Sequence, residues 1–390
     1  MKIQKLKDIC LTEITDGTHQ TPTYSEYGYI FLSSKNVTTQ KIDWDNVMFI
    51  PEKLHEELYK RVAPQIDDIL LAKNGTTGVA AIVDRDIVFD IYVSLALIRP
   101  NTEIVMPRYL LYAINNPVVK GYFDSSLKGI GVPNLHLKNI RETPIKIYDL
   151  ETQKAIVEKL DRICELISLR KQQLAKLDEL VKARFVEMFG DCKTNPKNWK
   201  TKALEKIANV GSSKRVFVEE LQDSGIPFYR GTEISTLAEK KAVIPALFIT
   251  EEHYKQLCET TGKPQKGDLL MPSICPDGRI WIVDTDEPFY FKDGRVLWVH
   301  LTSANYNSVF LLYTLKDRIM TDYASIASGT TFAELKIFAL KRCKVFDVPL
   351  ELQNQFANFV ERVDQQKQTV QQSLEKLELM KKALMQEYFG

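Results

Sequence analysis

The chain has 390 residues and a formal net charge of +1, from 52 Lys and Arg against 51 Asp and Glu. Its hydrophobic fraction of 44% and charged fraction of 26% are typical of folded protein, with room for about two to four domains, and exclude a mainly disordered chain. The near-neutral total also excludes a uniformly basic protein, so any positive charge that contacts nucleic acid must be local or come from a partner.

The sequence carries no sign of a membrane, disulfide or metal class. No stretch approaches the length of about 18 apolar residues that a membrane span needs, and Met1–Asp8 is not a signal-peptide start. The six cysteines are scattered, which favours reduced thiols, and the five histidines have no ligand spacing. We therefore expect a cytoplasmic protein without a metal site.

The first part of the chain has mixed α/β character. Residues 52–60 and 107–115 have helical patterns, whereas the short apolar runs 68–72, 79–83 and 92–98 are bounded by Gly, Asp or Pro and are typical of strands.

A long helix is predicted next, over residues 150–190, and a second one over 350–390. Neither segment has an internal Pro or Gly, and apolar residues recur at alternating steps of four and three, as in a coiled-coil seam. About 40 helical residues span roughly 60 Å. The predicted apolar seam consists of Ile156, Leu160, Ile163, Ile167, Leu174, Leu177, Phe356, Val360, Val363, Val370, Leu374 and Leu377.

Between the two helices the mixed pattern returns. A polar linker over 191–195 precedes helical patterns at 251–258 and 308–316 and a strand-like run at 280–283.

The chain is a tandem duplication. Residues 150–190 and 350–390 align without a gap at an offset of 200, with about 13 of about 41 positions identical, and both end in Phe-Gly. The runs beginning at Asp68 and Asp268 repeat at the same offset. The predicted domains are a first globular unit over 1–149, a helix over 150–190, a second globular unit over 191–349 and a helix over 350–390.

This arrangement predicts a molecular ruler. If the helices pair along their seams, the simplest arrangement is an antiparallel coiled coil with pseudo-two-fold symmetry. Two similar but diverged modules at a fixed separation suit a bipartite ligand, and DNA is the natural candidate, with half-sites of different sequence.

Signatures of catalysis are missing from the sequence. Gly75–Gly78 and Gly211–Lys214 lack the spacing of a phosphate-binding loop, and no Asn/Asp-Pro-Pro-Tyr/Phe stretch exists to hold a flipped base. The sequence favours a binding and assembly protein, and a coiled-coil scaffold without a DNA role remains open beside the DNA hypothesis.

The sequence resembles the specificity subunit of type I restriction–modification systems. The resemblance rests on Ile14–His19 followed by Pro22, on the paired segments 31–37 and 228–234, and on the two helices that end in Phe-Gly. It covers essentially the whole chain, although the second unit has Val210–Ser213 where the first has Asp-Gly-Thr-His.

The resemblance implies two target recognition domains, each reading one half of a bipartite, asymmetric DNA site. It implies that the helices set the spacing and dock two modification subunits, which methylate adenine, and that restriction subunits join them. This chain would bind no cofactor and catalyse nothing, while S-adenosylmethionine, ATP and Mg would belong to partner subunits. A specificity-type protein in another defence assembly is the alternative within this family.

The best candidates for DNA contact are polar and basic residues beside the repeated Gly-bearing loops, because Arg suits guanine, Asn suits adenine, and Lys and Thr suit phosphate. In the first unit they are Ser33, Lys35, Asn36, Lys73, Asn74, Thr76, Thr77, Lys128, Asn134, His136 and Lys138. In the second unit they are Arg230, Thr232, Ser273, Arg279, Lys292, Arg295, Thr330 and Lys336.

Overall fold

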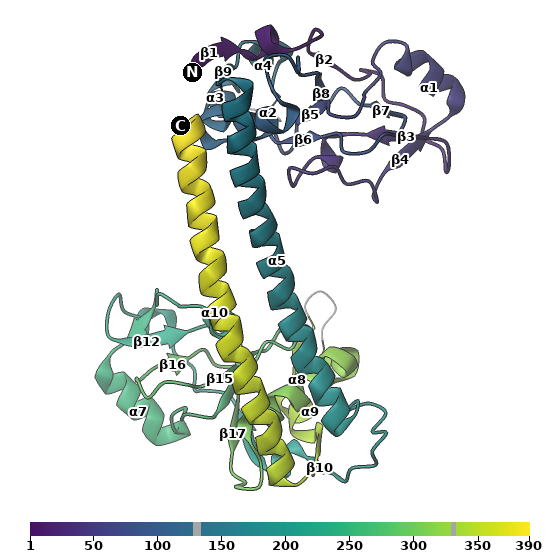
Figure 1. The fold of residues 1–390 in the computed structure, drawn as a ribbon. Coiled ribbons are helices and arrows are strands. Elements are labelled where there is room, and N and C mark those ends of the chain that lie inside the picture. The colour runs from purple at the N-terminus through teal and green to yellow at the C-terminus, as the bar shows by residue number, and fades with distance from the viewer. Residues whose placement is uncertain (128–133, 329–332) are drawn as a thin grey trace. The chain divides into compact units, whose positions relative to one another are not determined.

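The computed structural model describes residues 1–127, 134–328 and 333–390. The chain divides into two compact units, unit 1 with Met1–Gln172 and Gln371–Gly390, and unit 2 with Gln173–Val370. Two helices of 40 residues each, α5 (Leu150–Phe189) and α10 (Leu350–Phe389), contribute a segment to both units (Figure 1). The predicted duplicated α/β fold with two long helices is confirmed.

Lobe 1, the part of unit 1 outside the long helices, contains a four-stranded sheet in the order β2-β8-β5-β6 and a three-stranded sheet in the order β4-β3-β7. A separate pair, β1-β9, is antiparallel. The elements of lobe 1 are β1 (Lys2–Lys5), η1 (Leu6–Ile9), β2 (Thr15–Asp16), β3 (Tyr29–Leu32), η2 (Ser34–Asn36), β4 (Met48–Ile50), α1 (Glu52–Tyr59), β5 (Ile69–Ala72), β6 (Ala80–Ile82), β7 (Phe89–Ile91), β8 (Leu95–Ile98), α2 (Pro107–Ile114), α3 (Pro117–Ser126), α4 (Leu137–Arg141) and β9 (Pro144–Ile147).

Lobe 2, the corresponding part of unit 2, repeats these sheets as β11-β17-β14-β15, β13-β12-β16 and β10-β20, with a short pair β18-β19 in addition. In both lobes one neighbour pair of the three-stranded sheet is parallel. The elements of lobe 2 are β10 (Thr201–Ala203), η3 (Leu204–Lys206), β11 (Ala208–Gly211), η4 (Val218–Glu220), β12 (Ile226–Tyr229), α6 (Gly231–Ala238), β13 (Phe248–Ile249), α7 (Glu251–Thr261), β14 (Leu269–Pro272), β15 (Trp281–Ile282), β16 (Tyr290–Phe291), β17 (Val296–Leu301), α8 (Ser308–Ile326), β18 (Ala327–Ser328), β19 (Glu334–Leu335), α9 (Ile337–Arg342) and β20 (Lys344–Phe346).

The central sheet of each lobe is buried on both faces. Along β5, Ile69 and Leu71 face the core that packs against the long helices, whereas Leu70 and Ala72 face a second core on the other side. The alternation follows from the period of two in a strand. In β14, Leu269 faces the core that packs against the long helices and Leu270 faces the second core. A continuous apolar run therefore contributes side chains to both cores.

The long helices run antiparallel within each unit. In unit 1, Lys171 Nζ lies 3.0 Å from Glu378 Oε1, and Lys159 Nζ lies 3.3 Å from the hydroxyl of Tyr388. In unit 2, Lys367 donates a hydrogen bond to Asp178. Every residue of the predicted apolar seam is buried or half-buried, which is the environment that a helix–helix contact requires.

The Phe-Gly ends of both helices anchor them in the lobes. Phe189 is fully buried in the core of unit 2, and Phe389 is buried in the core of unit 1, where its ring lies 5.3 Å from that of Tyr109. Gly190 ends α5 with a φ of 84°, a conformation that favours glycine at a helix end. A Cβ there would also lie 2.9 Å from Pro196.

Some predicted elements have different lengths in the structure. The helix predicted over 308–316 is α8, which continues to Ile326, whereas its counterpart in lobe 1 is divided into α2 and α3. Pro117 accounts for this difference, because a proline cannot continue a helix but suits the first turn of a new one. The strand predicted over 92–98 begins only at Leu95.

We predict that Phe389→Ala lowers the free energy of unfolding by about 3–5 kcal/mol, because it removes a buried ring from the core of unit 1. Leu379→Ala is the matched control, since Leu379 is 68% exposed on the same helix, and we expect a change within about 0.5 kcal/mol. Urea unfolding measures both, and equal effects would contradict an anchoring role for Phe389.

Candidate nucleic-acid interface

Three segments of lobe 1 that are distant in sequence meet at one surface, which we call recognition surface 1 and define as residues 33–37, 73–78 and 134–138. Asn74 forms a β-bridge with Asn134, and the backbone N–H of Leu135 donates to the carbonyl of Lys73 at 2.9 Å. The hydroxyl of Thr76 donates to the carbonyl of Val37 at 3.1 Å. The predicted DNA-contact residues of the first unit that the structure describes therefore lie on neighbouring segments.

The side chains on recognition surface 1 differ in exposure. Lys35, Thr76, Asn134, His136 and Lys138 are exposed, whereas Asn74 and Thr77 are half-buried. The exposed group combines cations with hydrogen-bonding side chains, which is the mixture that both phosphates and base edges require.

The side chain of Lys73 lies beneath recognition surface 1. It is buried and forms an ion pair with Asp16, which is also buried, so Lys73 is not available to a duplex in this conformation. Removing one partner of a buried ion pair costs about 3–5 kcal/mol, because the other charge is left unpaired. Lys73 is therefore a structural residue beneath the surface, and it ties the 73–78 loop to Asp16 of the opening signature.

Asn36 and Ser33 also have structural roles. The Asn36 side chain is buried; its Oδ1 accepts from the backbone N–H of Ser33 at 3.0 Å, and its Nδ2 donates to the carbonyl of Asn46 at 2.9 Å. The Asn36 side chain is thus engaged within the protein, and half-buried Ser33 closes the same turn. These two residues shape the turn that presents Lys35.

Lobe 2 builds a corresponding recognition surface 2 from residues 230–232, 273–279, 292–295 and 334–338. The backbone N–H of Leu335 donates to the carbonyl of Ser273 at 2.7 Å, and the N–H of Ser273 donates to the carbonyl of Arg295 at 2.9 Å. These bonds repeat those that Lys73 makes with Leu135 and with Ser94 in lobe 1. The two surfaces therefore share a backbone frame.

The cations of recognition surface 2 are held by acidic neighbours. Arg279 Nε lies 2.6 Å from Asp277, and Arg295 forms an ion pair with Glu334. Glu334 also lies 3.3 Å from Lys336. Such pairs orient a guanidinium group but must rearrange, or be outcompeted, when a phosphate or a base approaches.

At the start of α6, Arg230 forms an ion pair with Glu233 at 2.8 Å. Burial by itself would raise the pKa of the Glu233 carboxyl, but hydrogen bonds from Arg230 and Thr232 outweigh it and lower that pKa to about 2. Glu233 is therefore ionised at neutral pH, and it fixes the Arg230 side chain beside exposed Thr232.

The remaining predicted residues of the second unit are Lys292, Ser273 and Thr330. Lys292 is exposed in the turn before β17. Ser273 is 2% exposed, and its backbone forms hydrogen bonds that support the surface. Thr330, like Lys128 of the first unit, lies outside the described residues.

Sequence reasoning missed Phe338, which is 64% exposed at the first turn of α9. It borders a pocket of about 560 Å³ together with Gly294, Glu334 and Lys336 of recognition surface 2. The repeat offset of 200 contained the signal, because it pairs Phe338 with Lys138, a candidate for DNA contact in the first unit. Exposed aromatic rings beside cations are a feature of proteins that bind single-stranded nucleic acid.

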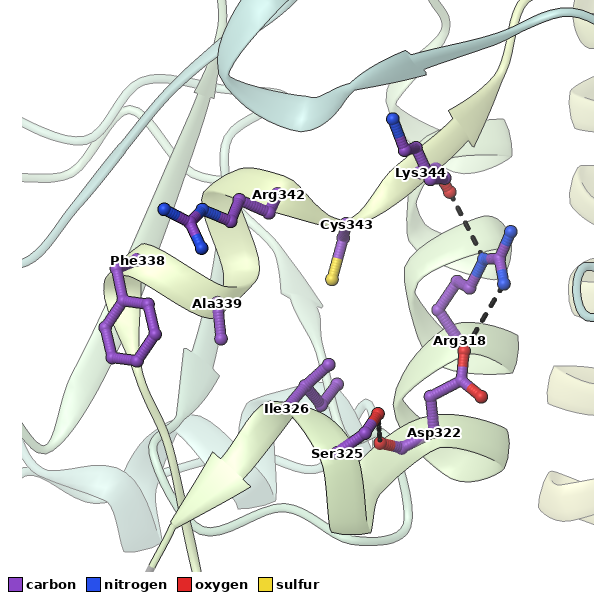
Figure 2. A pocket seen from close by; sticks show the side chains of 9 residues that line it. All are labelled: Arg318, Asp322, Ser325, Ile326, Phe338, Ala339, Arg342, Cys343 and Lys344. Carbon is purple, nitrogen blue, oxygen red and sulfur yellow. Dashed lines mark hydrogen bonds and ion pairs between the residues drawn. The ribbon is translucent and has the colours of Figure 1, made fainter.

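A second pocket, of about 300 Å³, is lined by residues of α8 and α9, among them Phe338 (Figure 2). Within it, the Arg318 side chain donates to Asp322 and to the carbonyl of Lys344. Burial raises the pKa of the Cys343 thiol to about 11, so this sulfur is protonated at neutral pH and is not an activated nucleophile.

The part of the chain that the structure describes contains neither a cluster of metal ligands nor a membrane-spanning helix. Within it, no group of three or more His, Cys, Asp or Glu side chains could hold a metal ion. Residues 1–127, 134–328 and 333–390 include no helix that is both long and apolar enough to cross a bilayer.

Curated relatives resemble nearly the whole chain or large parts of it. A Methanocaldococcus jannaschii protein named as the MjaX specificity subunit of a type I restriction enzyme is 23% identical over 411 aligned residues, which cover 98% of this chain and 91% of the relative. The EcoBI specificity subunit of Escherichia coli is 25% identical over 158 residues, covering 40% of this chain and 33% of the relative.

Solved structures resemble the fold over the full chain. The S subunit of a type I restriction–modification system from M. genitalium has a TM-score of 0.59 and 14% identity, and the match covers 100% of this chain and 96% of that chain. A chain from a structure of type I restriction–modification complex assembly and conformational transition has a TM-score of 0.60 and 18% identity, with coverage of 100% and 97%.

A protein-family model also matches the chain. The model for the type I restriction modification DNA specificity domain matches twice, over residues 1–179 and 196–379. The two matches coincide with the two halves of the duplication and together cover most of the 390 residues. The chain therefore belongs to the family of type I restriction–modification DNA specificity subunits.

Proposed function

We propose that recognition surfaces 1 and 2 each read one half of a bipartite, asymmetric DNA site within a type I restriction–modification complex. The observation that carries this proposal is the shared backbone frame with different side chains. Where the surface of lobe 1 carries Asn134, His136 and Lys138, the equivalent positions of lobe 2, at the offset of 200, carry Glu334, Lys336 and Phe338. A shared backbone frame that carries different side chains suits two half-sites of different sequence.

The paired helices supply the spacing in this proposal. Each of α5 and α10 is a continuous helix of 40 residues, and a stiff connector makes the number of intervening base pairs selective. Their outward faces, which are rich in exposed Lys, Glu and Gln, would dock two modification subunits, and restriction subunits would join that assembly.

The chemistry belongs to the partners in this proposal. The complex would methylate adenine with S-adenosylmethionine and would cleave DNA with ATP and Mg, all bound by the partner subunits. This chain would contribute base recognition and geometry. Its net charge of +1 suits a subunit whose partners provide much of the contact with the phosphate backbone.

Deleting the gene should abolish adenine methylation at one bipartite motif in the genome of the source organism. The physical reason is that the partner methyltransferase loses its only source of sequence readout in this complex. Genome-wide detection of methylated adenine with and without the gene measures the effect. If every methylated motif persists, the alternative of a coiled-coil scaffold without a DNA role is favoured.

Asn134→Ala and Arg279→Ala should weaken recognition at opposite half-sites. Each removes one exposed hydrogen-bonding side chain, from recognition surface 1 and recognition surface 2 respectively, and a lost base contact costs about 1–3 kcal/mol of discrimination. Methylation rates of the assembled complex on duplexes with single-base changes in either half measure this.

The control for these variants is Lys193→Ala, which removes an exposed cation in the linker after α5 and should leave discrimination unchanged in both halves. Relaxed specificity in both half-sites from a single variant would contradict the assignment of one half-site to each lobe.

A further inference from the structure

Two fully buried glutamines occupy equivalent places at the junctions between the lobes and the long helices. Gln153 lies in the first turn of α5 and Gln353 in the first turn of α10, and each is 0% exposed. Neither contributes to the apolar seam or to a recognition surface. A buried polar side chain is costly unless its hydrogen bonds are made, so the bonds of these amides indicate what they do.

Gln153 joins three segments of unit 1. Its Nε2 donates to the carbonyl of Ile104 and to that of Tyr148, both at 2.9 Å. Its Oε1 accepts from the backbone N–H of Met106 at 2.9 Å. Met106 precedes the first residue of α2, and Tyr148 follows β9, so one amide connects the start of the long helix to two places in the lobe.

Gln353 makes the same bonds in unit 2. Its Nε2 donates to the carbonyls of Asn305 at 3.0 Å and Val348 at 2.9 Å, and its Oε1 accepts from the N–H of Asn307 at 2.9 Å. The two lobes differ in most of the side chains discussed above, yet all three bonds recur at the equivalent backbone positions.

The connection continues from α2 to recognition surface 1. At the end of α2, Asn115 Oδ1 accepts from the N–H of Ala80 at 3.0 Å, and its Nδ2 donates to the carbonyl of Ala80 at 2.9 Å. Ala80 begins β6 and is separated from the 73–78 loop by one residue, Val79. In unit 1, hydrogen-bonded backbone therefore links the first turn of α5 to a loop of the recognition surface.

We propose that Gln153 and Gln353 are positioning residues that fix the angle between each lobe and its long helix, and thereby enforce the spacer length between the half-sites. This inference rests on the proposed function. Adding one base pair moves a half-site by about 3.4 Å along the duplex and by about 35° around it. A lobe that rotated freely about the start of its long helix would follow that displacement. A lobe held to the helix by the hydrogen bonds of the amide resists it.

The test compares methylation of duplexes whose spacer is native, one base pair shorter or one base pair longer. We expect complexes with Gln153→Ala or Gln353→Ala to raise the rate on altered spacers, relative to the native spacer, by about tenfold, equivalent to about 1.4 kcal/mol. The ratio is internal to each preparation, so a smaller folded fraction scales all rates equally. Gln153→Met keeps most of the side-chain volume and covers the case in which the alanine variant fails to fold.

The matched control is Asn116→Ala. Asn116 is buried, and its Oδ1 caps α3 by accepting from the N–H groups of Val118 at 2.7 Å and Val119 at 3.1 Å. This variant removes a buried amide from the same lobe without changing the junction, and it should leave the spacer ratio unchanged. Spacer ratios that are equal in wild type, Gln153→Met and Gln353→Ala would overturn the proposal.

A second measurement separates this proposal from the proposed function. Spin labels at exposed Glu158 on α5 and exposed Lys120 on α3 report the distance distribution across the junction in the full chain without DNA. Gln153→Met should broaden this distribution, and an unchanged width would refute the clamp. If the wild-type complex methylates no bipartite sequence, the proposed function fails, while the distance distribution still decides whether Gln153 stiffens the junction.

Discussion

The burial of the central sheets on both faces is the constraint on which the rest of each unit depends. A strand such as β5 that is apolar on both sides cannot lie at a surface, so one face must meet the long helices and the other must be covered by a second layer. In lobe 1 that layer includes β3 and β7 together with Val37, Ile42 and Trp44 of the segment after β3. The loops that follow β5 and β14, residues 73–78 and 273–279, form part of the two recognition surfaces.

The position of these loops after buried central strands explains how the two surfaces can share a backbone frame and carry different side chains. The bonds that join β5 to residue 135 and β14 to residue 335 are backbone bonds, so they tolerate changes of side chain. The side-chain contacts below the two surfaces differ more than these backbone bonds do. Lobe 1 uses the buried pair of Lys73 and Asp16, whereas in lobe 2 the hydroxyls of Ser212 and Ser213 donate to the carbonyls of Val296 and Phe291. Specificity can diverge on such a frame without a new fold.

The sequence alone predicted the elements that carry a long periodic signal. The two helices and the duplication were evident because the apolar period persists over about 40 residues and repeats at one offset. The role of Lys73 was not predictable, since its partner Asp16 is 57 positions away and only the fold brings the two charges together. Phe338 was missed for a different reason, because a search for polar readers passes over an aromatic residue. The buried glutamines gave no local signal, as Gln is common on exposed helix faces.

Unit 1 is built from two separate parts of the sequence, and this affects the order in which the chain folds. Unit 2 is continuous from Gln173 to Val370, whereas unit 1 includes Gln371–Gly390, whose Phe389 and Met385 belong to its core. During synthesis, residues 1–172 emerge first but cannot close that core until the last turn of α10 arrives. Unit 2 can complete its core before unit 1 does, reversing the usual order in which N-terminal domains fold first. Lobe 1 must therefore persist with part of its apolar core uncovered while most of the chain is made, which makes it the half that depends most on protection from aggregation.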